Sequence, residues 1–148
     1  AIGASLATDG KPVVVIAGDG GIQLNIQELQ TIRRMNLPVK VIVLNNLCHG
    51  MVRQFQQSYF DERYQSTLWG YSAPAFHQVA TAYGIPSRQV ADPAMLGSAL
   101  DECWQNADGP FLLEVMIDSS ANAYPKMAFG RPISEMEPLA APTAMEST

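Results

Sequence analysis

The sequence has little positive charge and few charged residues of either sign. Its 148 residues include 9 Lys and Arg against 14 Asp and Glu, which gives a net charge of −5 and a charged fraction of 16%. This balance argues against a nucleic-acid interface built on phosphate neutralisation. The charged fraction is below the roughly 25% usual for soluble domains. We therefore expect part of the surface to contact other protein.

Long apolar runs and a cysteine framework are also missing. The longest apolar runs, such as Val13–Ala17, are far shorter than the ~20 residues that span a bilayer. Two cysteines make no disulfide framework. No basic segment followed by an apolar one opens the chain, so we find no signal peptide. We expect a protein without a membrane or nucleic-acid partner, located in the reducing cytoplasm.

Apolar periodicity predicts strands that alternate with helices. The expected strands are Val13–Ala17, Val39–Leu44, a weak Gln89–Val90 and Phe111–Ile117. The first is expected to be covered on both faces because its apolar run is unbroken. The expected helices are Ala1–Ala7, Ile22–Met35, one capped by Ser72 and ended by Gly84, and one from Asp92 to near Asn106. The polar stretch Gln54–Tyr71 is assigned neither helix nor strand.

This alternation predicts an α/β fold, a parallel sheet with helices on both faces. We place this domain at residues 1–118. Residues 119–148, rich in Ala, Pro, Ser and Met, form a C-terminal tail that is a candidate lid. The helix Ala1–Ala7 has no capping residue before it, so we expect it to continue a longer polypeptide.

Parallel sheets bind ligands at the carboxyl ends of their strands. The first strand is followed by Gly18-Asp19-Gly20-Gly21, which leads into a helix. The glycines permit positive φ and close backbone approach, and the helix start offers free N–H groups, so this segment has the outline of a phosphate site. Asp19 fits if Mg²⁺ lies between its carboxylate and the phosphate, with the amide oxygen of Asn46 at the next strand end as a second hard ligand. Each motif alone is common in turns, but both at successive strand ends favour one joint site.

Two other phosphate sites are excluded by the residues present. A dinucleotide fingerprint needs Gly or Ala where Gln23 stands, and an acidic residue where the second strand ends in Asn45-Asn46. The Gly-Lys-Ser/Thr of a Walker loop is absent.

Gly-Asp-Gly at 18–20, a helix and a strand, then Asn-Asn at 45–46 resembles the signature of thiamine-diphosphate-dependent enzymes, in the domain that binds the diphosphate. Further segments are similar to acetolactate synthase large subunits: Asn25–Leu29, Leu37–Lys40, Gly50–Gln54 and Glu62–Tyr64. The resemblance extends from Ala1 to about Met136 and implies the thiamine-diphosphate-binding fold.

The resemblance implies a set of site residues. Mg²⁺ would be held by Asp19, Asn46 and the backbone carbonyl of Cys48. The cofactor-binding residues would be Gly18, Asp19, Gly20, Gly21, Asn46, His49, Gly50 and Met51, mostly through backbone N–H groups, with Met51 beneath the cofactor. Phe55 would lie in the acceptor pocket, where acetolactate synthases usually have Trp. The tail at Tyr124–Pro132 also departs from the family's usual Pro- and Gly-rich ending.

The implied activity is decarboxylation of a 2-keto acid and carboligation to an acceptor, as in a lyase or transferase. Its cofactors would be thiamine diphosphate and Mg²⁺, with FAD left open. Family members carry an N-terminal domain whose glutamate activates the cofactor, and their active sites form between subunits. We therefore expect no catalytic residue in this chain, a homodimer or homotetramer, and no turnover by this chain alone.

Two alternatives stay open. The chain could be a non-catalytic α/β interaction module that has lost cofactor binding, or a nucleotide-binding α/β domain unrelated to thiamine. The aromatic residues Tyr59, Phe60, Tyr64, Trp69 and Tyr71 form either a self-packed surface loop or a flexible cover over the cofactor. We interpret His77 as a surface or packing histidine and Cys103 as a core residue.

Overall fold

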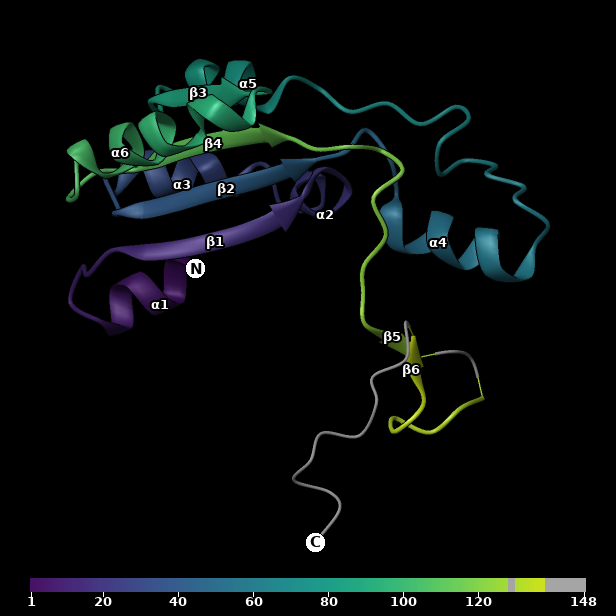
Figure 1. Ribbon diagram of the computed structural model, residues 1–148. Coiled ribbons are helices and arrows are strands. Elements are labelled where there is room, and N and C mark those ends of the chain that lie inside the picture. Colours follow the sequence, from purple (N-terminus) through teal and green to yellow (C-terminus); the bar gives the residue numbers. More distant parts are fainter. Residues whose placement is uncertain (128–129, 138–148) are drawn as a thin grey trace, which may run out of the picture.

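A computed structural model describes residues 1–127 and 130–137. Its centre is a four-stranded sheet in the order β1-β2-β4-β3 (Figure 1). The strands are β1 (Val13–Gly18), β2 (Val39–Asn45), β3 (Ser87–Val90) and β4 (Phe111–Met116). All three pairings are parallel, which confirms the predicted α/β fold.

Helices connect these strands, and a short antiparallel pair follows them. The helices are α1 (Ile2–Ala7), α2 (Asp19–Gln23), α3 (Glu28–Arg34), α4 (Gly50–Tyr59), α5 (Phe76–Ala82), the 3₁₀ turn η1 (Pro93–Met95) and α6 (Leu96–Gln105). The later strands are β5 (Lys126–Met127) and β6 (Met136–Glu137). Among the described helices, none combines the length and apolar character that crossing a bilayer requires.

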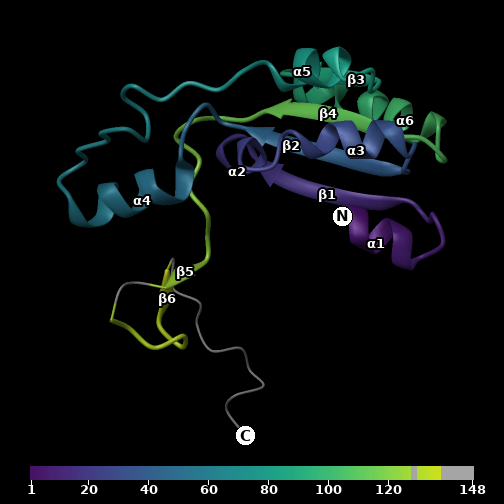
Figure 2. The same ribbon diagram turned by 180° about the vertical axis from the view of Figure 1, so that it is seen from behind.

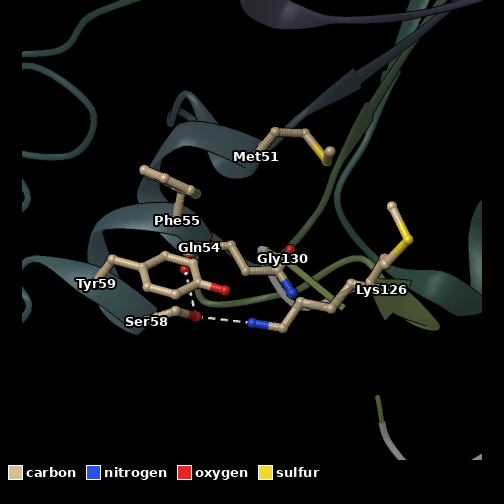
Figure 3. A pocket seen from close by; sticks show the side chains of 8 residues that line it. Met51, Gln54, Phe55, Ser58, Tyr59, Lys126 and Gly130 are labelled. Carbon is tan, nitrogen blue, oxygen red and sulfur yellow. Dashed lines mark hydrogen bonds between the residues drawn. The ribbon is translucent and has the colours of Figure 1, made fainter. Parts of the chain in front are cut away.

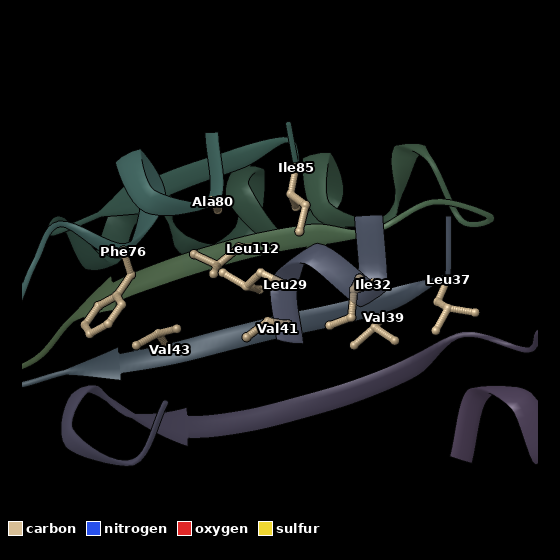
Figure 4. Close-up of a cluster of buried hydrophobic side chains, with 10 residues drawn as sticks. All are labelled: Leu29, Ile32, Leu37, Val39, Val41, Val43, Phe76, Ala80, Ile85 and Leu112. Carbon is tan, nitrogen blue, oxygen red and sulfur yellow. The ribbon is translucent and has the colours of Figure 1, made fainter. Parts of the chain in front are cut away.

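The main core lies between one face of the sheet and the helices α3 and α5. It comprises Leu29, Ile32, Leu37, Val39, Val41, Val43, Phe76, Ala80, Ile85 and Leu112 (Figure 4). A second cluster under α6 comprises Val90, Ala99, Cys103, Phe111 and Leu113, so Cys103 is a core residue as expected. Because the two clusters use alternate residues of β4, helices cover both faces of that strand.

β1 is an edge strand, and one of its faces is open. Val14 is 45% and Ile16 is 67% exposed, whereas Val15 between them packs against the main core. The expectation that this strand is covered on both faces is wrong. Its sequence is as apolar as that of β2, but within residues 1–127 and 130–137 no element packs on its second face.

The helices near the site differ from the expected boundaries. The predicted helix Ile22–Met35 is two helices, α2 and α3, separated by a turn, and α2 already begins at Asp19. α4 begins at Gly50, before the polar stretch that was assigned no element, and extends into that stretch as far as Tyr59. The predicted cap at Ser72 is wrong, because α5 begins at Phe76 and its N-cap, Ala75, makes no side-chain hydrogen bond.

Other boundaries agree with the sequence. Gly84, with φ of +75°, follows α5 as expected. The Asp92 carboxylate accepts from the Ala94 N–H at 2.9 Å and so caps the η1 turn before α6.

α4 stands away from the sheet in both views and is tethered to the segment after β4 (Figures 1 and 2). The Arg53 guanidinium donates to the Ser120 carbonyl at 3.0 Å. Gln54 exchanges two hydrogen bonds with the backbone of Ala123, donating at 3.0 Å and accepting at 3.1 Å. These contacts fix α4 relative to the carboxyl end of β4.

The expected division at residue 118 and the lid stay predictions. Residues 119–127 and 130–137 of the tail are described, and they carry the β5 and β6 pair. Residues 128–129 and 138–148, also assigned to the lid, lie outside the described residues.

Candidate functional site

The carboxyl ends of β1 and β2 lie side by side and bring the two sequence motifs together. Gly18 pairs in register with Leu44, so the residues that follow each strand share one edge of the sheet. Asp19 is 3% exposed. Its Oδ2 accepts from the Cys48 N–H at 3.3 Å, and Asn46 Oδ1 accepts from the same N–H at 3.2 Å. The two predicted ligand oxygens therefore converge on one backbone group.

These groups offer oxygen donors of the kind that Mg²⁺ prefers: a carboxylate, an amide oxygen and backbone carbonyls. The Cys48 thiol does not belong to this set, because burial raises its pKa and keeps it protonated at neutral pH. The described residues contain no group of three or more His, Cys, Asp or Glu that could hold a metal. A cation here would depend on Asp19 together with amide and carbonyl oxygens.

Two adjoining hollows meet at these residues. The larger, about 390 Å³, is lined by Asp19, Asn46 and Cys48 together with apolar side chains such as Ile16. The smaller, about 180 Å³, is lined by Gly18, Asp19, Gly20, Gly21, Cys48, His49, Gly50, Met51 and Val52. Between them the hollows border every residue of the predicted cofactor-binding set.

Two of the predicted glycines are needed for close packing. A Cβ on Gly20 would lie 2.6 Å from His49 Cε1, and one on Gly50 would lie 2.8 Å from Asn46 Nδ2. Gly18 and Gly21 face open space. The positive φ that glycine permits is not used, because the glycines with positive φ all lie elsewhere in the chain. Close approach is the property that this site uses.

Tyr71 lies beside the site, and the sequence indicated it only as one of several loop aromatics. Its ring contacts that of His49 edge to face, with centroids 4.4 Å apart. Burial and the negative charge of Asp19 raise the pKa of Tyr71 to about 12, so the phenol stays protonated at neutral pH. In the same loop, Tyr64 and Trp69 instead pack on each other. The loop thus both packs on itself and reaches the site.

Met51 joins the site to a third hollow. Its side chain is 73% exposed and lines both hollows at Asp19. It also lines one of about 400 Å³ between α4 and the tail, together with Phe55 and Lys126 (Figure 3). Lys126 lies across this hollow from α4 and donates to Ser58 Oγ at 2.7 Å. Phe55 does not border Asp19, so the structure places it next to the predicted metal site rather than in it.

The sequence reasoning missed a buried acid behind the site. Glu114 on β4 is fully buried and bonds to Asn45, the residue before Asn46. A single Glu inside the apolar run Phe111–Met116 was the available signal.

The family model described as "Thiamine pyrophosphate enzyme, C-terminal TPP binding domain" matches residues 1–115. The chain belongs to this thiamine pyrophosphate enzyme family. The resemblance seen in its two motifs is confirmed.

The relatives of this thiamine pyrophosphate enzyme chain include acetolactate synthases. It is 42% identical over 136 residues to the acetolactate synthase isozyme 2 large subunit of Escherichia coli (strain K12), covering 92% of this chain and 24% of the relative. It is 40% identical over 121 residues to the probable acetolactate synthase large subunit of Methanococcus aeolicus, covering 82% and 20%. The chain thus spans about a fifth to a quarter of the length of these relatives.

A solved structure has the same fold. The thiamine diphosphate-dependent 4-hydroxybenzoylformate decarboxylase of Rhodococcus jostii RHA1 aligns with a TM-score of 0.69 and 29% sequence identity. The alignment covers 80% of this chain and 22% of that one. The parallel α/β sheet of this chain therefore agrees with its family membership.

Proposed function

We propose that this chain anchors Mg²⁺ and the diphosphate of thiamine diphosphate in a 2-keto acid decarboxylase or carboligase of the acetolactate synthase kind. One observation carries the proposal. Asp19 and Asn46, which lie 27 positions apart, direct their oxygens at the same Cys48 N–H. The family membership, the oxygen-donor set and the hollows around it support the proposal.

Each residue has a distinct part in this proposal. Asp19, Asn46 and the Cys48 carbonyl hold the cation, and the backbone N–H groups of Gly20 and Gly21 contact the diphosphate. The N–H groups of His49 and Gly50 donate to the Thr67 and Cys48 carbonyls, both at 2.9 Å, and exchange these partners for the diphosphate when the cofactor binds. Met51 supports the organic part of the cofactor. When bound, the cofactor supplies the carbanion chemistry by which 2-keto acids lose carbon dioxide.

The proposed position of the substrate is the hollow lined by Phe55 and Lys126. We place the acceptor there, next to Met51, and expect it to be a 2-keto acid as the resemblance implies. We expect the glutamate that activates the cofactor to come from a further domain of the same or a neighbouring subunit, in a homodimer or homotetramer. Binding of FAD and the cytoplasmic location stay predictions.

Substitution of Asp19 tests the proposal. Asp19→Asn keeps the shape of the side chain and removes its charge, so the Mg²⁺-dependent affinity for thiamine diphosphate should fall by about a hundredfold or more, because a direct charged ligand is lost. Titration calorimetry of the full-length protein with thiamine diphosphate, with and without Mg²⁺, measures this loss.

Asp9→Asn is the matched control, since Asp9 is an exposed residue whose left-handed backbone also suits Asn. It should leave the affinity unchanged. If the unsubstituted protein shows no saturable, Mg²⁺-dependent binding, the proposal fails and the non-catalytic module remains. If AMP or NAD displaces thiamine diphosphate, the nucleotide-binding alternative replaces it.

A further inference from the structure

A fully buried carboxylate connects three elements behind the candidate site. Glu114 on β4 is 0% exposed. Its Oε1 accepts from Asn45 Nδ2 at the end of β2, at 2.7 Å. Its Oε2 accepts from the backbone N–H of His77 on α5 at 3.1 Å and lies 2.6 Å from the Nδ1 of the same residue. His77 is thus a packing histidine, consistent with its interpretation from the sequence.

This carboxylate is ionised at neutral pH. Burial alone would raise the pKa of Glu114, but the hydrogen bonds from His77 and Asn45 outweigh it and leave the pKa below its ordinary value. An ionised carboxylate only accepts hydrogen bonds. Asn45 must therefore present its NH₂ end to Glu114, and its amide oxygen points the other way.

The amide oxygen of Asn45 holds the turn that follows β2. It accepts from the Leu47 N–H at 3.0 Å. Leu47 has φ of +51°, in the left-handed region that residues with a branched, bulky side chain rarely occupy. Such a conformation persists only where its surroundings hold it. The Asn45 side chain, at the end of β2, supplies that restraint.

The same turn carries the candidate ligands. Asn46 and Cys48 flank Leu47. The Cys48 N–H donates both to the Asn46 side chain and to the Asp19 carboxylate. A change in the Leu47 backbone would therefore move both Asn46 and Cys48. We propose that Glu114 is a positioning residue for cofactor binding, which acts by orienting the Asn45 amide and so holds the turn at residues 46–49 against Asp19. This inference rests on the proposed function, because it assigns the turn to metal and diphosphate binding.

A purely structural role would have a different signature. Glu114 accepts from the first turn of α5, whose own N-cap makes no side-chain bond, so it also stabilises that helix. Loss of this cap would lower the unfolding midpoint without changing cofactor affinity. The two roles separate when affinity and stability are measured on the same variants.

The test starts with Glu114→Gln in the full-length protein. A Gln at this position can accept from Asn45 or from His77, but its NH₂ then faces the other donor. Thiamine diphosphate affinity at saturating Mg²⁺ should fall by about tenfold to a hundredfold, the usual cost of losing a group that orients a metal ligand. Asn45→Ala should lower the affinity similarly while leaving the contact between Glu114 and α5 in place.

A paired substitution restores the link. In Asn45→Asp with Glu114→Gln, the new carboxylate accepts from both Leu47 and the Gln NH₂, while the Gln oxygen accepts from His77. Affinity should return to within about threefold of the starting value, because the two sites are in direct contact and their effects do not add. Asn45→Asp alone sets two carboxylates face to face and should lower the affinity at least as much as Glu114→Gln.

Lys40→Met is the control for a buried charge with no link to the turn. Lys40 lies at the other end of β2 and is fully buried, with its ammonium donating to the Asn106 and Gly109 carbonyls. This variant should lower the unfolding midpoint and leave cofactor affinity unchanged. If Glu114→Gln behaves in the same way, Glu114 is structural only and the inference is overturned.

A measurement made in the absence of cofactor tests this inference independently of the proposed function. Hydrogen exchange at the Leu47 amide should accelerate at least about tenfold in Glu114→Gln and not in Lys40→Met, because only the first variant frees the Leu47 N–H. Unchanged exchange overturns the link itself. Faster exchange in a protein that binds no thiamine diphosphate would keep the link and reject the function.

Discussion

Lys40 on β2 and Glu114 on β4 illustrate how single buried charged side chains find hydrogen-bond partners. The Lys40 ammonium is enclosed by the turn before β4, where two carbonyls accept from it and burial lowers its pKa. Glu114 is satisfied by donors from β2 and α5. Each group stays buried because hydrogen bonds replace its lost hydration. Of the two, only Glu114 contacts Asn45, whose amide oxygen holds the turn that carries the candidate ligands.

Phe55 provides a prediction at the residue scale. Phe55→Trp fills part of the hollow shared with Met51 and Lys126, so it should change the preference between two competing 2-keto acid acceptors by about tenfold, the usual effect of a small change in an apolar pocket. Affinity for thiamine diphosphate should stay the same, because Phe55 does not line the hollows at Asp19. Product ratios from acceptor mixtures measure the change.

Phe60→Trp is the matched control. The centroid of the Phe60 ring lies 5.9 Å from that of Phe55, but Phe60 does not line the hollow between α4 and the tail. It should leave the product ratios unchanged. Equal ratios in Phe55→Trp and the unsubstituted protein would exclude Phe55 from the acceptor pocket.

At the scale of elements, α4 and α5 depend on contacts distant in sequence. α4 is fixed to the segment after β4 by Arg53 and Gln54. α5 receives its cap from Glu114 rather than from a residue just before it. Both helices are short, and short helices are marginal without tertiary contacts. Both helices therefore depend on β4 and on the segment that follows it.

The cap of α5 gives a prediction at this scale. Ser72 is exposed and lies four positions before Phe76, so Ser72→Ala should change the free energy of unfolding by less than about 0.5 kcal/mol. Asp92→Ala removes an actual cap and should cost about 1 kcal/mol. Urea denaturation of both variants measures the difference. A loss of about 1 kcal/mol at Ser72 would show that it caps α5 after all.

For the whole molecule, the open face of β1 is the main feature. Val14 and Ile16 are exposed on an edge strand whose described pairing partner is β2 alone. Ile16 also lines the larger hollow at Asp19. Unpaired apolar edges favour pairing with further chain. This open face agrees with the low charged fraction, which suggested a surface that contacts other protein.

The open edge predicts how the 148-residue chain behaves by itself. It should self-associate as its concentration rises, and Val14→Lys should reduce this association because a charge on an edge strand disfavours pairing. Light scattering coupled to size exclusion measures the mass of each species. Leu24→Lys is the control, because Leu24 is 79% exposed but lies in the turn after α2. An equal effect of both substitutions would show that general hydrophobicity, not the β1 edge, drives association.

Local patterning by itself determined the four strands of the parallel sheet, the family and the two strand-end motifs, but not the strands β5 and β6. Unbroken apolar runs predict buried strands wherever they lie, and Asp19 and Asn46 were found because each follows such a run. The same runs do not reveal which strand is at an edge, so the open face of β1 was missed. Gln-rich α4, the contact of Tyr71 with His49 and the cap from Glu114 were not predicted, because the partners of these residues lie far away in sequence. Only tertiary structure decides such contacts, because a buried polar group is satisfied by whatever the fold places beside it.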